Sequence, residues 1–382
     1  MKILAVATPG AGHVNPMLPL IEALLAQGDD VTLAACEDPG GVVTSTGAAF
    51  RVAGRGEMEW IHDLQARVLH GKPGDGITPE RINHYFFPRV FAEVAAPDMI
   101  DDVVALGREL RPDVVVFETY ALAGPLAAEV LGVPSVHHLI SPMLPHDVSE
   151  LADDAVSPMW RSFDRSTPGY AGLYRGITIE LSPPSLEGQT VPAGESLAMR
   201  PAPMPATEPV PADPPCVYLT LGTFFGGNTE VFRTALAGLA NEDIEVVVTV
   251  GANNEPAAIG PVPANSRVER YVPQADLLPR CSAVIHHGGA GTMYGSLAHG
   301  LPQVVLPQGA DNFVNGGLLA RCGAGLSIGP EQISPETVCD AVRSVLTDPS
   351  YRHTARQLAE ELAALPEPGD VARGLRDRFG GG

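Results

Sequence analysis

The segment CSAVIHHGGAGTMYGSLAHG, residues 281–300, ends an apolar run with two histidines and then places three glycines within four positions. Adjacent histidines on a strand point to opposite faces, and their neighbours supply no further ligands at a zinc-binding spacing, so a metal site is disfavoured. Gly288, Gly289 and Gly291 allow a ligand to approach the backbone, and a following helix would offer unpaired amides. Alone, the segment leaves open a diphosphate cradle and a turn that packs helix on strand, with His286 buried.

Two more loops of unusual composition favour the phosphate-binding interpretation. They are GTFFGGNT at 222–229 and PQGADN at 307–312, and each follows an apolar run. In open parallel sheets, ligands bind where the carboxyl ends of the strands meet. We therefore expect the glycine turn and these two loops to line one crevice.

The N-terminal stretch KILAVATPGAGHVNPMLPLIEALLAQG, residues 2–28, holds another candidate, His13. Its pattern predicts a strand, a glycine-rich turn, and a helix with Asn15 as its cap, Pro16 at its first position and Gly28 at its end. His13 would lie in the turn at the carboxyl end of the strand. An imidazole, with an unperturbed pKa of about 6.5, can accept a hydroxyl proton at neutral pH.

The same turn imitates a dinucleotide-binding fingerprint, which makes an NAD-dependent oxidoreductase a rival interpretation. GAGHVN supplies the first glycines of that fingerprint, and the acidic Glu37 and Asp38 follow the second expected strand. However, Asn15 occupies the third glycine position, and the bulk of His13 intrudes where a pyrophosphate would lie. A dinucleotide site also leaves the loops of the second half unexplained.

The elements that would position these loops recur in both halves of the chain. Apolar runs typical of buried strands are DVTLAAC, DVVVFE and PSVHHL in the first half and CVYLTLG, IEVVVTVG, RVERYV, SAVIHH and PQVVLP in the second. Such runs alternating with helical stretches predict parallel sheets covered by helices on both faces. A chain of 382 residues exceeds what one core usually supports, which predicts two domains. Residues 183–215 are dense in proline and indicate an interdomain linker.

Composition and charge exclude several classes of partner. The net charge of −21 argues against nucleic acid and against an anionic membrane surface, both of which attract clustered Lys and Arg. No run approaches the roughly 20 apolar residues that span a bilayer. The five scattered cysteines form no zinc or disulfide pattern, so we expect a reduced, cytoplasmic location. The aromatic segments MEWIHDLQ and RINHYFFPRVF favour ordinary core over a pocket lining.

The run from VPQADLLPRCSAVIHHGGAGT to GLPQVVLPQGADNFVN, together with GAGHVNPMLPL, resembles the GT-B glycosyltransferases of antibiotic and macrolide biosynthesis. These enzymes transfer sugars from nucleotide diphosphates to natural-product scaffolds. The resemblance spans essentially the whole chain and is strongest over 267–325 and 1–28. It implies an α/β fold of two Rossmann-like domains whose parallel sheets face each other across a cleft. The acceptor domain would be 1–205 and the nucleotide-sugar domain 206–366, with 367–382 as a tail that packs back on the first domain.

The resemblance also implies which residues bind the donor. It assigns the diphosphate to His286, to the Thr292 hydroxyl and to the glycine backbone. Tyr271 would stack on the nucleobase, and Asp311 and Asn312 would hold hydroxyls of the donor sugar. Many relatives carry Asp-Gln at the last two positions, so the shorter Asn312 leaves the sugar open. The full implied donor set is Gly12, Thr223, Tyr271, Val272, His286, Gly288, Gly289, Ala290, Gly291, Thr292, Tyr294, Asp311 and Asn312.

On the acceptor side, the resemblance makes His13 the general base. Glu118 stands where relatives often carry Asp and is the candidate that orients the imidazole, with Thr119 as the alternative. The non-catalytic interpretations are that His13 only packs in a loop and that Glu118 caps a helix. The implied reaction is a single displacement that inverts the anomeric carbon. The nucleotide sugar is the co-substrate, and no other cofactor and no metal ion are expected, because no acidic metal-binding loop accompanies the motifs.

Residue 294 bears on the identity of the nucleotide. Relatives that use UDP-sugars commonly place a Glu eight positions after the first His of the motif, where its carboxylate binds both ribose hydroxyls, and here that position holds Tyr294. The phenol of a tyrosine is a poorer acceptor for two ribose hydroxyls than a carboxylate is, and deoxythymidine lacks the 2′-hydroxyl. The resemblance therefore implies a dTDP-sugar, and a deoxysugar, as the donor.

Two further alternatives to a transferase stay open. A catalytically silent helper that activates another glycosyltransferase could keep the fold, although the presence of His13, Thr292 and Asp311 favours an enzyme. An epimerase could share the architecture, but it would need no acceptor to release nucleoside diphosphate. The sequence is compatible with a homodimer. It does not indicate which natural product is the acceptor.

Overall fold

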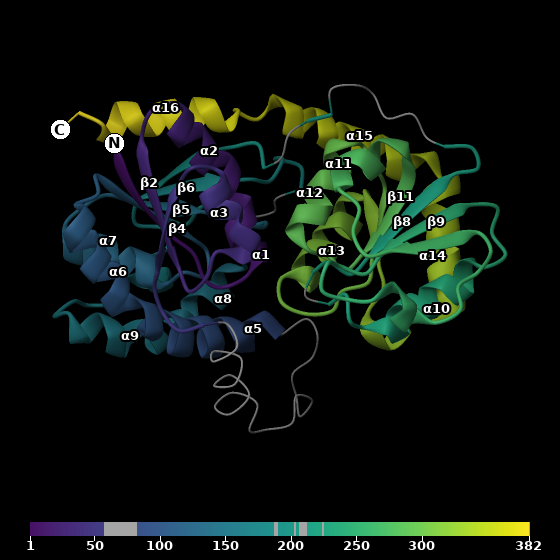
Figure 1. Cartoon of the computed structure of the whole chain (residues 1–382), viewed down its shortest axis with the longest axis horizontal. Helices are drawn as coiled ribbons and strands as arrows, with labels where there is room; N and C mark the ends of the chain where they lie inside the picture. Colours follow the sequence, from purple (N-terminus) through teal and green to yellow (C-terminus); the bar gives the residue numbers. More distant parts are fainter. Residues whose placement is uncertain (57–81, 187–189, 202–203, 206–211, 224, 382) are drawn as a thin grey trace. The chain divides into compact units, whose positions relative to one another are not determined.

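The computed structural model describes residues 1–56, 82–186, 190–201, 204–205, 212–223 and 225–381. These residues form two compact α/β units (Figure 1). The first unit combines Met1–Leu181, Gln189–Pro201 and Pro366–Gly382, and the second combines Ser182–Gly188 with Ala202–Leu365. The last segment of the chain therefore belongs to the first unit.

The first unit is built on a seven-stranded sheet whose described pairings are all parallel. The order β3-β2-β1-β4-β5-β6-β7 reverses direction between β1 and β4. The strands are β1 (Lys2–Val6), β2 (Asp30–Ala35), β3 (Ala49–Val52), β4 (Val114–Glu118), β5 (Ser135–His138), β6 (Ile177–Glu180) and β7 (Glu195–Ala198). Every side chain of the central strand β4 is buried, as in a sheet covered on both faces.

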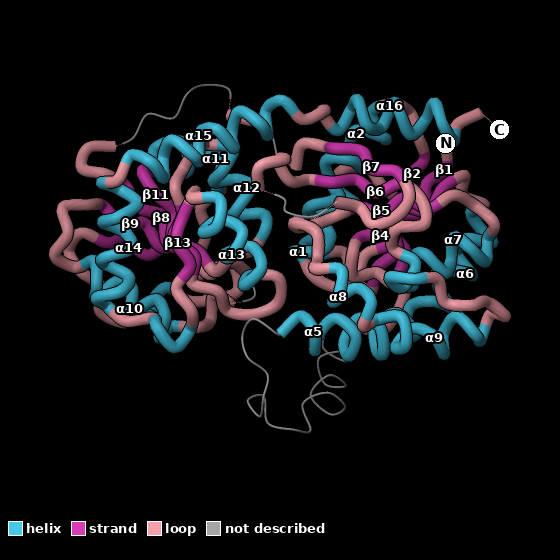
Figure 2. Tube along the Cα trace, turned by 180° about the vertical axis from the view of Figure 1, so that it is seen from behind, coloured by secondary structure: helices cyan, strands magenta, loops and turns pink. Residues whose placement is uncertain are grey.

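Helices lie on both faces of this first sheet (Figures 1 and 2). They are α1 (Ala11–Val14), α2 (Leu18–Ala26), α3 (Val42–Ser45), α5 (Ile82–Phe86), the π-helical η4 (Phe87–Ala95), α6 (Ala96–Leu110), α7 (Ala123–Leu131), α8 (His146–Glu150), α9 (Ala152–Ser162) and α16 (Pro368–Phe379). The C-terminal helix α16 packs on α2, where Gln27 Nε2 donates to the Gly369 carbonyl at 3.0 Å. Arg378 pairs with Glu195 of β7 at 2.6 Å, so the C-terminal segment closes this unit.

Two local expectations for the first unit are wrong. Helical structure begins at Ala11, because Gly10 turns the chain with φ 110°. Asn15 has helical φ −56°, follows α1 as its C-cap and begins a 3₁₀ turn, so it is not the N-terminal cap of a helix. The edge strand β7 lies inside the proline-rich segment 183–215, which is therefore not wholly a linker. The β7 residues ESLA are mostly exposed, so this strand has no apolar run that a sequence pattern could reveal.

The second unit is built on a six-stranded parallel sheet of order β10-β9-β8-β11-β12-β13. Its strands are β8 (Cys216–Thr220), β9 (Glu245–Thr249), β10 (Ser266–Glu269), β11 (Cys281–His286), β12 (Gln303–Val305) and β13 (Gly325–Ser327). Its helices are α10 (Thr229–Leu239), α11 (Gln274–Leu277), α12 (Ala290–Ala298), α13 (Asn312–Cys322), α14 (Pro335–Thr347) and α15 (Pro349–Ala364). The strand order reverses between β8 and β11, so this unit repeats the plan of the first.

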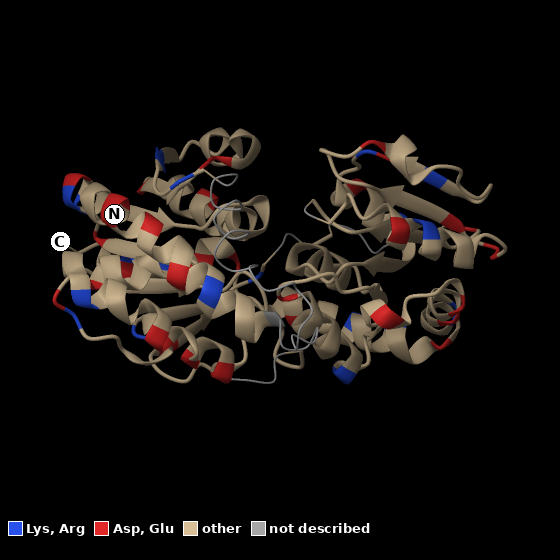
Figure 3. Ribbon diagram, turned by 90° about the horizontal axis from the view of Figure 1, so that it is seen from below, with Lys and Arg blue, Asp and Glu red and all other residues tan. Residues whose placement is uncertain are grey.

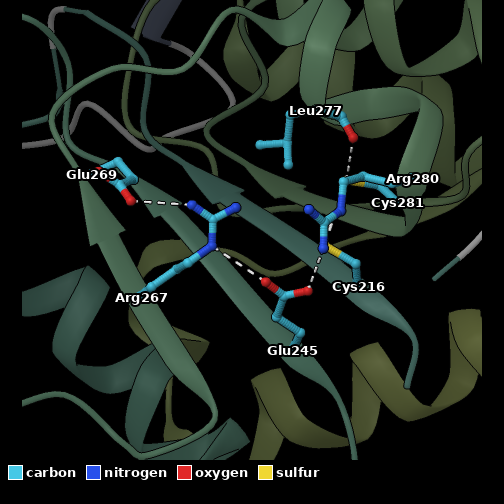
Figure 4. Close-up of polar contacts among 7 residues, drawn as sticks. All are labelled: Cys216, Glu245, Arg267, Glu269, Leu277, Arg280 and Cys281. Carbon is cyan, nitrogen blue, oxygen red and sulfur yellow. Dashed lines mark hydrogen bonds and ion pairs between the residues drawn. The ribbon is translucent and has the colours of Figure 1, made fainter. Parts of the chain in front are cut away.

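Figure 4 shows the edge of the second sheet at which its strands begin. Glu245, the first residue of β9, accepts hydrogen bonds from Arg280 at 2.7 Å and from Arg267 at 3.3 Å. The buried thiols of Cys216 and Cys281, which begin β8 and β11, lie 4.0 Å apart. Hydrogen bonding to Cys216 and burial raise the pKa of the Cys281 thiol. These groups tie the amino ends of the strands together and leave the opposite edge to the loops of the predicted site.

Charged side chains are spread over both units. Figure 3 shows Asp and Glu on each unit, with Lys and Arg interspersed among them on the side that is seen. This distribution accompanies a net charge of −21. Within the described ranges, no helix is both long and apolar enough to cross a membrane.

His286, the last residue of β11, is completely buried. The Gly288 amide donates to its Nδ1 at 3.1 Å, so its Nε2 carries the proton and donates to Gln303 Oε1 at 2.7 Å. Both bonds suit the neutral ring. Burial lowers the pKa of His286 to about 4, although the hydrogen bond to Gln303 acts in the opposite direction.

The buried His286 predicts that stability depends on pH. Its pKa lies below the value of about 6.5 expected in the unfolded chain, so the unfolded state binds the extra proton. The free energy of unfolding should therefore fall as the pH drops from about 6.5 towards about 4, by up to about 1.4 kcal/mol per pH unit for this one group.

Urea titrations across this pH window would test the prediction. His286→Gln should lose stability less steeply than wild type as the pH falls, because one titrating group is gone. The control His353→Gln replaces an exposed histidine of α15 and should keep the wild-type slope. Curves for His286→Gln and wild type that run parallel would contradict the prediction.

Candidate active site

The carboxyl ends of β1 and β4 lie side by side, because these strands pair in parallel with Val6 opposite Phe117. Glu118 is the last residue of β4, and His13 lies on α1, directly after the turn that follows β1. The strand order reverses at this point, and open α/β sheets bind ligands at such points. The fold thus brings together two predicted residues that are far apart in the sequence.

His13 and Glu118 form a close pair together with Thr8. His13 Nδ1 lies 3.2 Å from Glu118 Oε1, and Thr8 Oγ1 lies 2.9 Å from the first atom and 2.6 Å from the second. The amides of Thr8 and Tyr120 donate to the two oxygens of Glu118 at 3.0 and 2.7 Å. The side chain of His13 is 21% exposed and that of Glu118 is fully buried. An imidazole that solvent can reach is therefore backed by a buried carboxylate.

A buried carboxylate is costly unless hydrogen bonds and an opposite charge compensate it. Burial raises the pKa of Glu118, but the attraction of His13 and the hydrogen bonds from His13, Thr8 and the Tyr120 amide outweigh burial. The net pKa of Glu118 is lower than usual, so the group is ionised at neutral pH. It can stabilise the positive charge that appears when His13 takes up a proton.

Thr119, the alternative partner of His13, points elsewhere. Its Oγ1 lies 3.1 Å from His137 Nε2, and both side chains are buried. His137 stacks on Phe117 with ring centroids 5.3 Å apart. Of the two candidates, Glu118 is thus the one that contacts His13.

Aromatic rings border His13, and sequence reasoning missed them. The ring centroid of Phe91, on η4, lies 5.8 Å from that of His13, and Tyr120 stands edge-on to His13 at 5.2 Å. Phe91 is partly exposed, whereas Phe87 on the same helix is buried. The segment RINHYFFPRVF therefore supplies both core and site border. The other aromatic segment, MEWIHDLQ, lies outside the described residues.

In the second unit, the three loops of the predicted phosphate site follow β8, β11 and β12, which are neighbours in the sheet. Hydrogen bonds join these loops to one another. Asn228 Nδ2 in the loop after β8 donates to Gln308 Oε1 in the loop after β12 at 2.9 Å. Asn315 Nδ2, on helix α13 after that loop, donates to the Gly288 carbonyl at 2.8 Å. The three loops meet at one edge of the sheet.

The backbone of the turn before helix α12 adopts a conformation that requires glycine. Gly288 has φ 98°, and a Cβ there would lie 2.7 Å from the Asn312 carbonyl oxygen, so a larger residue does not fit. Gly289 is the N-cap, and no side chain caps the helix. A Cβ on Gly291 would meet no other atom within 4 Å. The first amides of α12, from Ala290 onward, therefore form the kind of helix N-terminus that binds phosphate.

The expected contact between His286 and a diphosphate stays a prediction. The ring is buried, and both nitrogens already have partners. The next residue, His287, is partly exposed and lies between Gly222 and Gly289, where a Cβ on Gly222 would come 2.5 Å from its Cε1. Its Nδ1 has no hydrogen-bond partner among the described residues, and burial lowers its pKa to about 3. His287 is thus the histidine of the pair that faces the loops, and His286 holds the turn from behind.

Tyr294 is buried, and its expected place in the donor site stays a prediction. Its side chain is 3% exposed, and its hydroxyl lies 2.8 Å from Ser182 Oγ. A different face of α12 adjoins α11, where Gln274 Nε2 donates to Thr292 Oγ1 at 3.0 Å and a Cβ on Gly295 would lie 3.2 Å from Gln274 Oε1. Counting along the sequence could not tell which of these faces Tyr294 occupies.

Asp311 and Asn312 have different surroundings. Asn312 is buried, and its Oδ1 accepts from the amides of Gln308 and Gly309 at 3.4 and 3.3 Å, so it holds the loop after β12. Asp311 is partly exposed and accepts from Asn312 Nδ2 at 3.2 Å and from Asn315 Nδ2 at 3.1 Å. Asp311 is therefore the more suitable group for a sugar hydroxyl, and Asn315 is a supporting residue that sequence reasoning missed.

The remaining predicted residues lie at the surface of their own units. Tyr271, two residues after β10, is 66% exposed, and Thr223 after β8 is also exposed. Val272 is partly buried against the Cys216 and Tyr218 cluster. Gly12 is exposed on α1 beside His13, in the first unit. In the described ranges, no group of three or more His, Cys, Asp or Glu side chains could hold a metal ion, and metal independence stays a prediction.

Comparison with known proteins identifies families and relatives that are similar to this chain. Models described as the N-terminal and C-terminal domains of Erythromycin biosynthesis protein CIII-like proteins match residues 82–192 and 233–377. The 10-deoxymethynolide desosaminyltransferase of Streptomyces venezuelae is 31% identical, over 97% of this chain and 95% of that protein. The TDP-daunosamine transferase DnrS of Streptomyces peucetius is 32% identical, also over 97% of this chain and 95% of that protein.

A solved structure is similar over the same length. The glycosyltransferase SsfS6 of Streptomyces sp. SF2575, complexed with thymidine diphosphate, is 27% identical with a TM-score of 0.77 and 99% coverage of each chain. Sequence and fold therefore agree from the first strand to the last helix. The chain belongs to the EryCIII-like family of antibiotic glycosyltransferases, enzymes of GT-B fold that act on nucleotide sugars.

Proposed function

We propose that this glycosyltransferase moves a deoxysugar from a dTDP-sugar to a hydroxyl group of a natural-product acceptor, with His13 as the general base. The observation that carries the proposal is the pair of His13 and Glu118, whose Nδ1 and Oε1 atoms are 3.2 Å apart. Because Nδ1 faces the ionised carboxylate, Nε2 is the atom that can receive a proton. An accessible imidazole with a buried anion behind it is the arrangement that proton abstraction from a hydroxyl requires.

The proposed reaction is a single displacement. The acceptor hydroxyl gives its proton to His13 Nε2 while its oxygen attacks the anomeric carbon from the side opposite the diphosphate. The new glycosidic bond forms as the bond between the anomeric carbon and the diphosphate oxygen breaks, and the configuration inverts. The nucleoside diphosphate leaves with the electron pair of that bond, and Glu118 offsets the charge of the imidazolium.

The second unit supplies groups for the leaving diphosphate. The amides at the start of α12 point at the turn after β11 without a side-chain cap, and His287 borders the same turn. Negative charge that develops on the diphosphate would be stabilised by these preorganised donors. Asp311 would hold the sugar, and the exposed ring of Tyr271 would stack on the base.

Two observations support a dTDP-sugar as the donor. One relative is named TDP-daunosamine transferase, and SsfS6 is complexed with thymidine diphosphate. In this chain no Asp or Glu occurs between Cys281 and Ala310, so α12 offers no carboxylate to the ribose diol of a uridine nucleotide. A deoxyribose lacks the 2′-hydroxyl and needs such a group less. This support does not depend on Tyr294.

One of the two acidic residues of the dehydrogenase interpretation, Asp38, is engaged elsewhere. Asp38 accepts hydrogen bonds from the amides of Val43 and Thr44 at 2.8 and 3.0 Å, so it is engaged at the start of α3. The relatives are named as transferases, which supports neither an oxidoreductase nor a silent helper. A cytoplasmic location stays a prediction that rests on five scattered cysteines without a disulfide or zinc spacing.

Replacing His13 tests the proposed base. His13→Ala should lower kcat about 10²- to 10⁴-fold, because proton transfer in the transition state is lost, while calorimetry shows nearly unchanged TDP affinity. The control His353→Ala, on the exposed face of α15, should keep wild-type turnover. If His13→Ala turned over within a few fold of wild type, His13 would have no part in the chemistry.

Side-by-side titration of TDP and UDP tests the proposed nucleotide. Leaving a buried ribose hydroxyl without a partner costs about 1–3 kcal/mol, so TDP should bind about tenfold more tightly or better. Calorimetry at one ionic strength measures both dissociation constants. Equal or tighter binding of UDP would remove the case for a dTDP-sugar.

Gly288→Ala tests the cradle. The added Cβ would meet the Asn312 carbonyl at 2.7 Å, and alanine rarely adopts φ 98°, so the turn and the first amides of α12 should shift. We expect TDP affinity to fall about tenfold or more. Gly374→Ala, where a Cβ on α16 meets no other atom within 4 Å, is the matched control and should bind TDP as wild type does. Unchanged TDP binding by Gly288→Ala would place the diphosphate elsewhere.

A further inference from the structure

Thr8 is a buried residue of the first unit that no role assigned so far includes. It follows β1 and is 0% exposed. It makes two contacts with Glu118 and one with His13. Its Oγ1 lies 2.9 Å from His13 Nδ1, which is closer than the 3.2 Å between that nitrogen and Glu118 Oε1. Of these two partners of His13 Nδ1, the nearer one is therefore the Thr8 hydroxyl.

The hydrogen atoms in this cluster can be assigned because backbone amides only donate. The Thr8 amide donates to Glu118 Oε1 at 3.0 Å, and the Tyr120 amide donates to Oε2 at 2.7 Å, so both oxygens act as acceptors. A carboxylate engaged in this way accepts the single hydroxyl proton of Thr8 across the short 2.6 Å contact. The Thr8 oxygen then faces His13 with lone pairs only.

We propose that Thr8 is a positioning residue that fixes the tautomer of His13. A lone pair of Thr8 Oγ1 can accept a proton from Nδ1 but cannot donate one, so the neutral ring must carry its proton on Nδ1. Nε2 is then bare and ready to take the acceptor proton. Thr8 transfers no proton itself, and its hydroxyl stays bonded to Glu118 throughout.

Thr8 also holds the Glu118 carboxylate in place beside the imidazole of His13. Glu118 Oε1 accepts from the Thr8 amide and from the Thr8 hydroxyl, so one residue holds that oxygen with two donors. His13 stands on the adjacent helix α1 and meets the oxygens of Thr8 and Glu118 together. Loss of the hydroxyl would remove the nearer of the two acceptors that favour a proton on Nδ1, and of these two it would leave Glu118 Oε1 at the longer distance of 3.2 Å.

Nuclear magnetic resonance of ¹⁵N-histidine-labelled protein tests the tautomer without any need for turnover. The signals of His13 among the 11 histidines are those that disappear in His13→Ala. In the wild type, two-bond proton–nitrogen correlations should show the neutral His13 ring protonated at Nδ1. A wild-type ring protonated at Nε2 would overturn the proposal, whatever the variants do.

Two substitutions at Thr8 complete the test. Thr8→Val keeps the shape and removes the hydroxyl, and it should populate the Nε2-protonated tautomer and lower kcat about tenfold or more while TDP affinity stays within twofold. Thr8→Ser keeps the hydroxyl and should retain the wild-type tautomer and a kcat within about threefold. If Thr8→Val fails to fold, Thr8→Ala removes the same hydroxyl and takes its place in the comparison with Thr8→Ser.

The outcomes separate this proposal from the function on which it rests. A Thr8→Val protein with both the wild-type tautomer and the wild-type kcat would show that Thr8 is merely structural. A His13→Ala protein with wild-type turnover would remove the proposed base, yet the spectra would still report whether Thr8 sets the tautomer of His13. A fall in kcat for Thr8→Val without a change of tautomer would also overturn the positioning role.

Discussion

A parallel sheet brings the carboxyl ends of all its strands to one edge, and both candidate sites depend on this constraint. In each unit the site lies where the strand order reverses, between β1 and β4 and between β8 and β11. His13 and Glu118 meet there although 105 positions separate them. The opposite edge of the second sheet carries the ion pairs of Glu245 with Arg267 and Arg280.

The two sites use different charges at equivalent places in the fold. The first unit keeps an ionised carboxylate in its interior, where Thr8 and Tyr120 compensate it. The second has no acidic residue from Cys281 to Ala310, and burial lowers the pKa of His286 to about 4 and of His287 to about 3. Both of these rings are neutral at physiological pH, so in the proposed phosphate site the attraction for an anion would come from the α12 amides and would hardly vary near neutrality.

Sequence patterns predicted the central strands because these are continuous apolar runs, as in β4 and β11. They missed β7, whose polar residues lie at an exposed edge. Adjacent histidines alternate across a strand, and the sequence does not say which face carries the loops. In the structure His286 is buried and His287 lies beside Gly222 and Gly289. The sequence did not point to Thr8, because a threonine after a strand belongs to no recognisable motif. Its contact with Glu118 becomes visible only in the fold.

The last helix has a consequence for the order of events during synthesis. Helix α16 buries Val371, Ala372 and Leu375 in the first unit, and Arg376 reaches Asp29 at 3.5 Å. The second unit lies almost entirely within Ala202–Leu365, so all of its strands have left the ribosome before α16 is made. The unit whose strands are translated first is thus the last to be completed. Until then, the part of the first unit against which Val371, Ala372 and Leu375 pack stays uncovered.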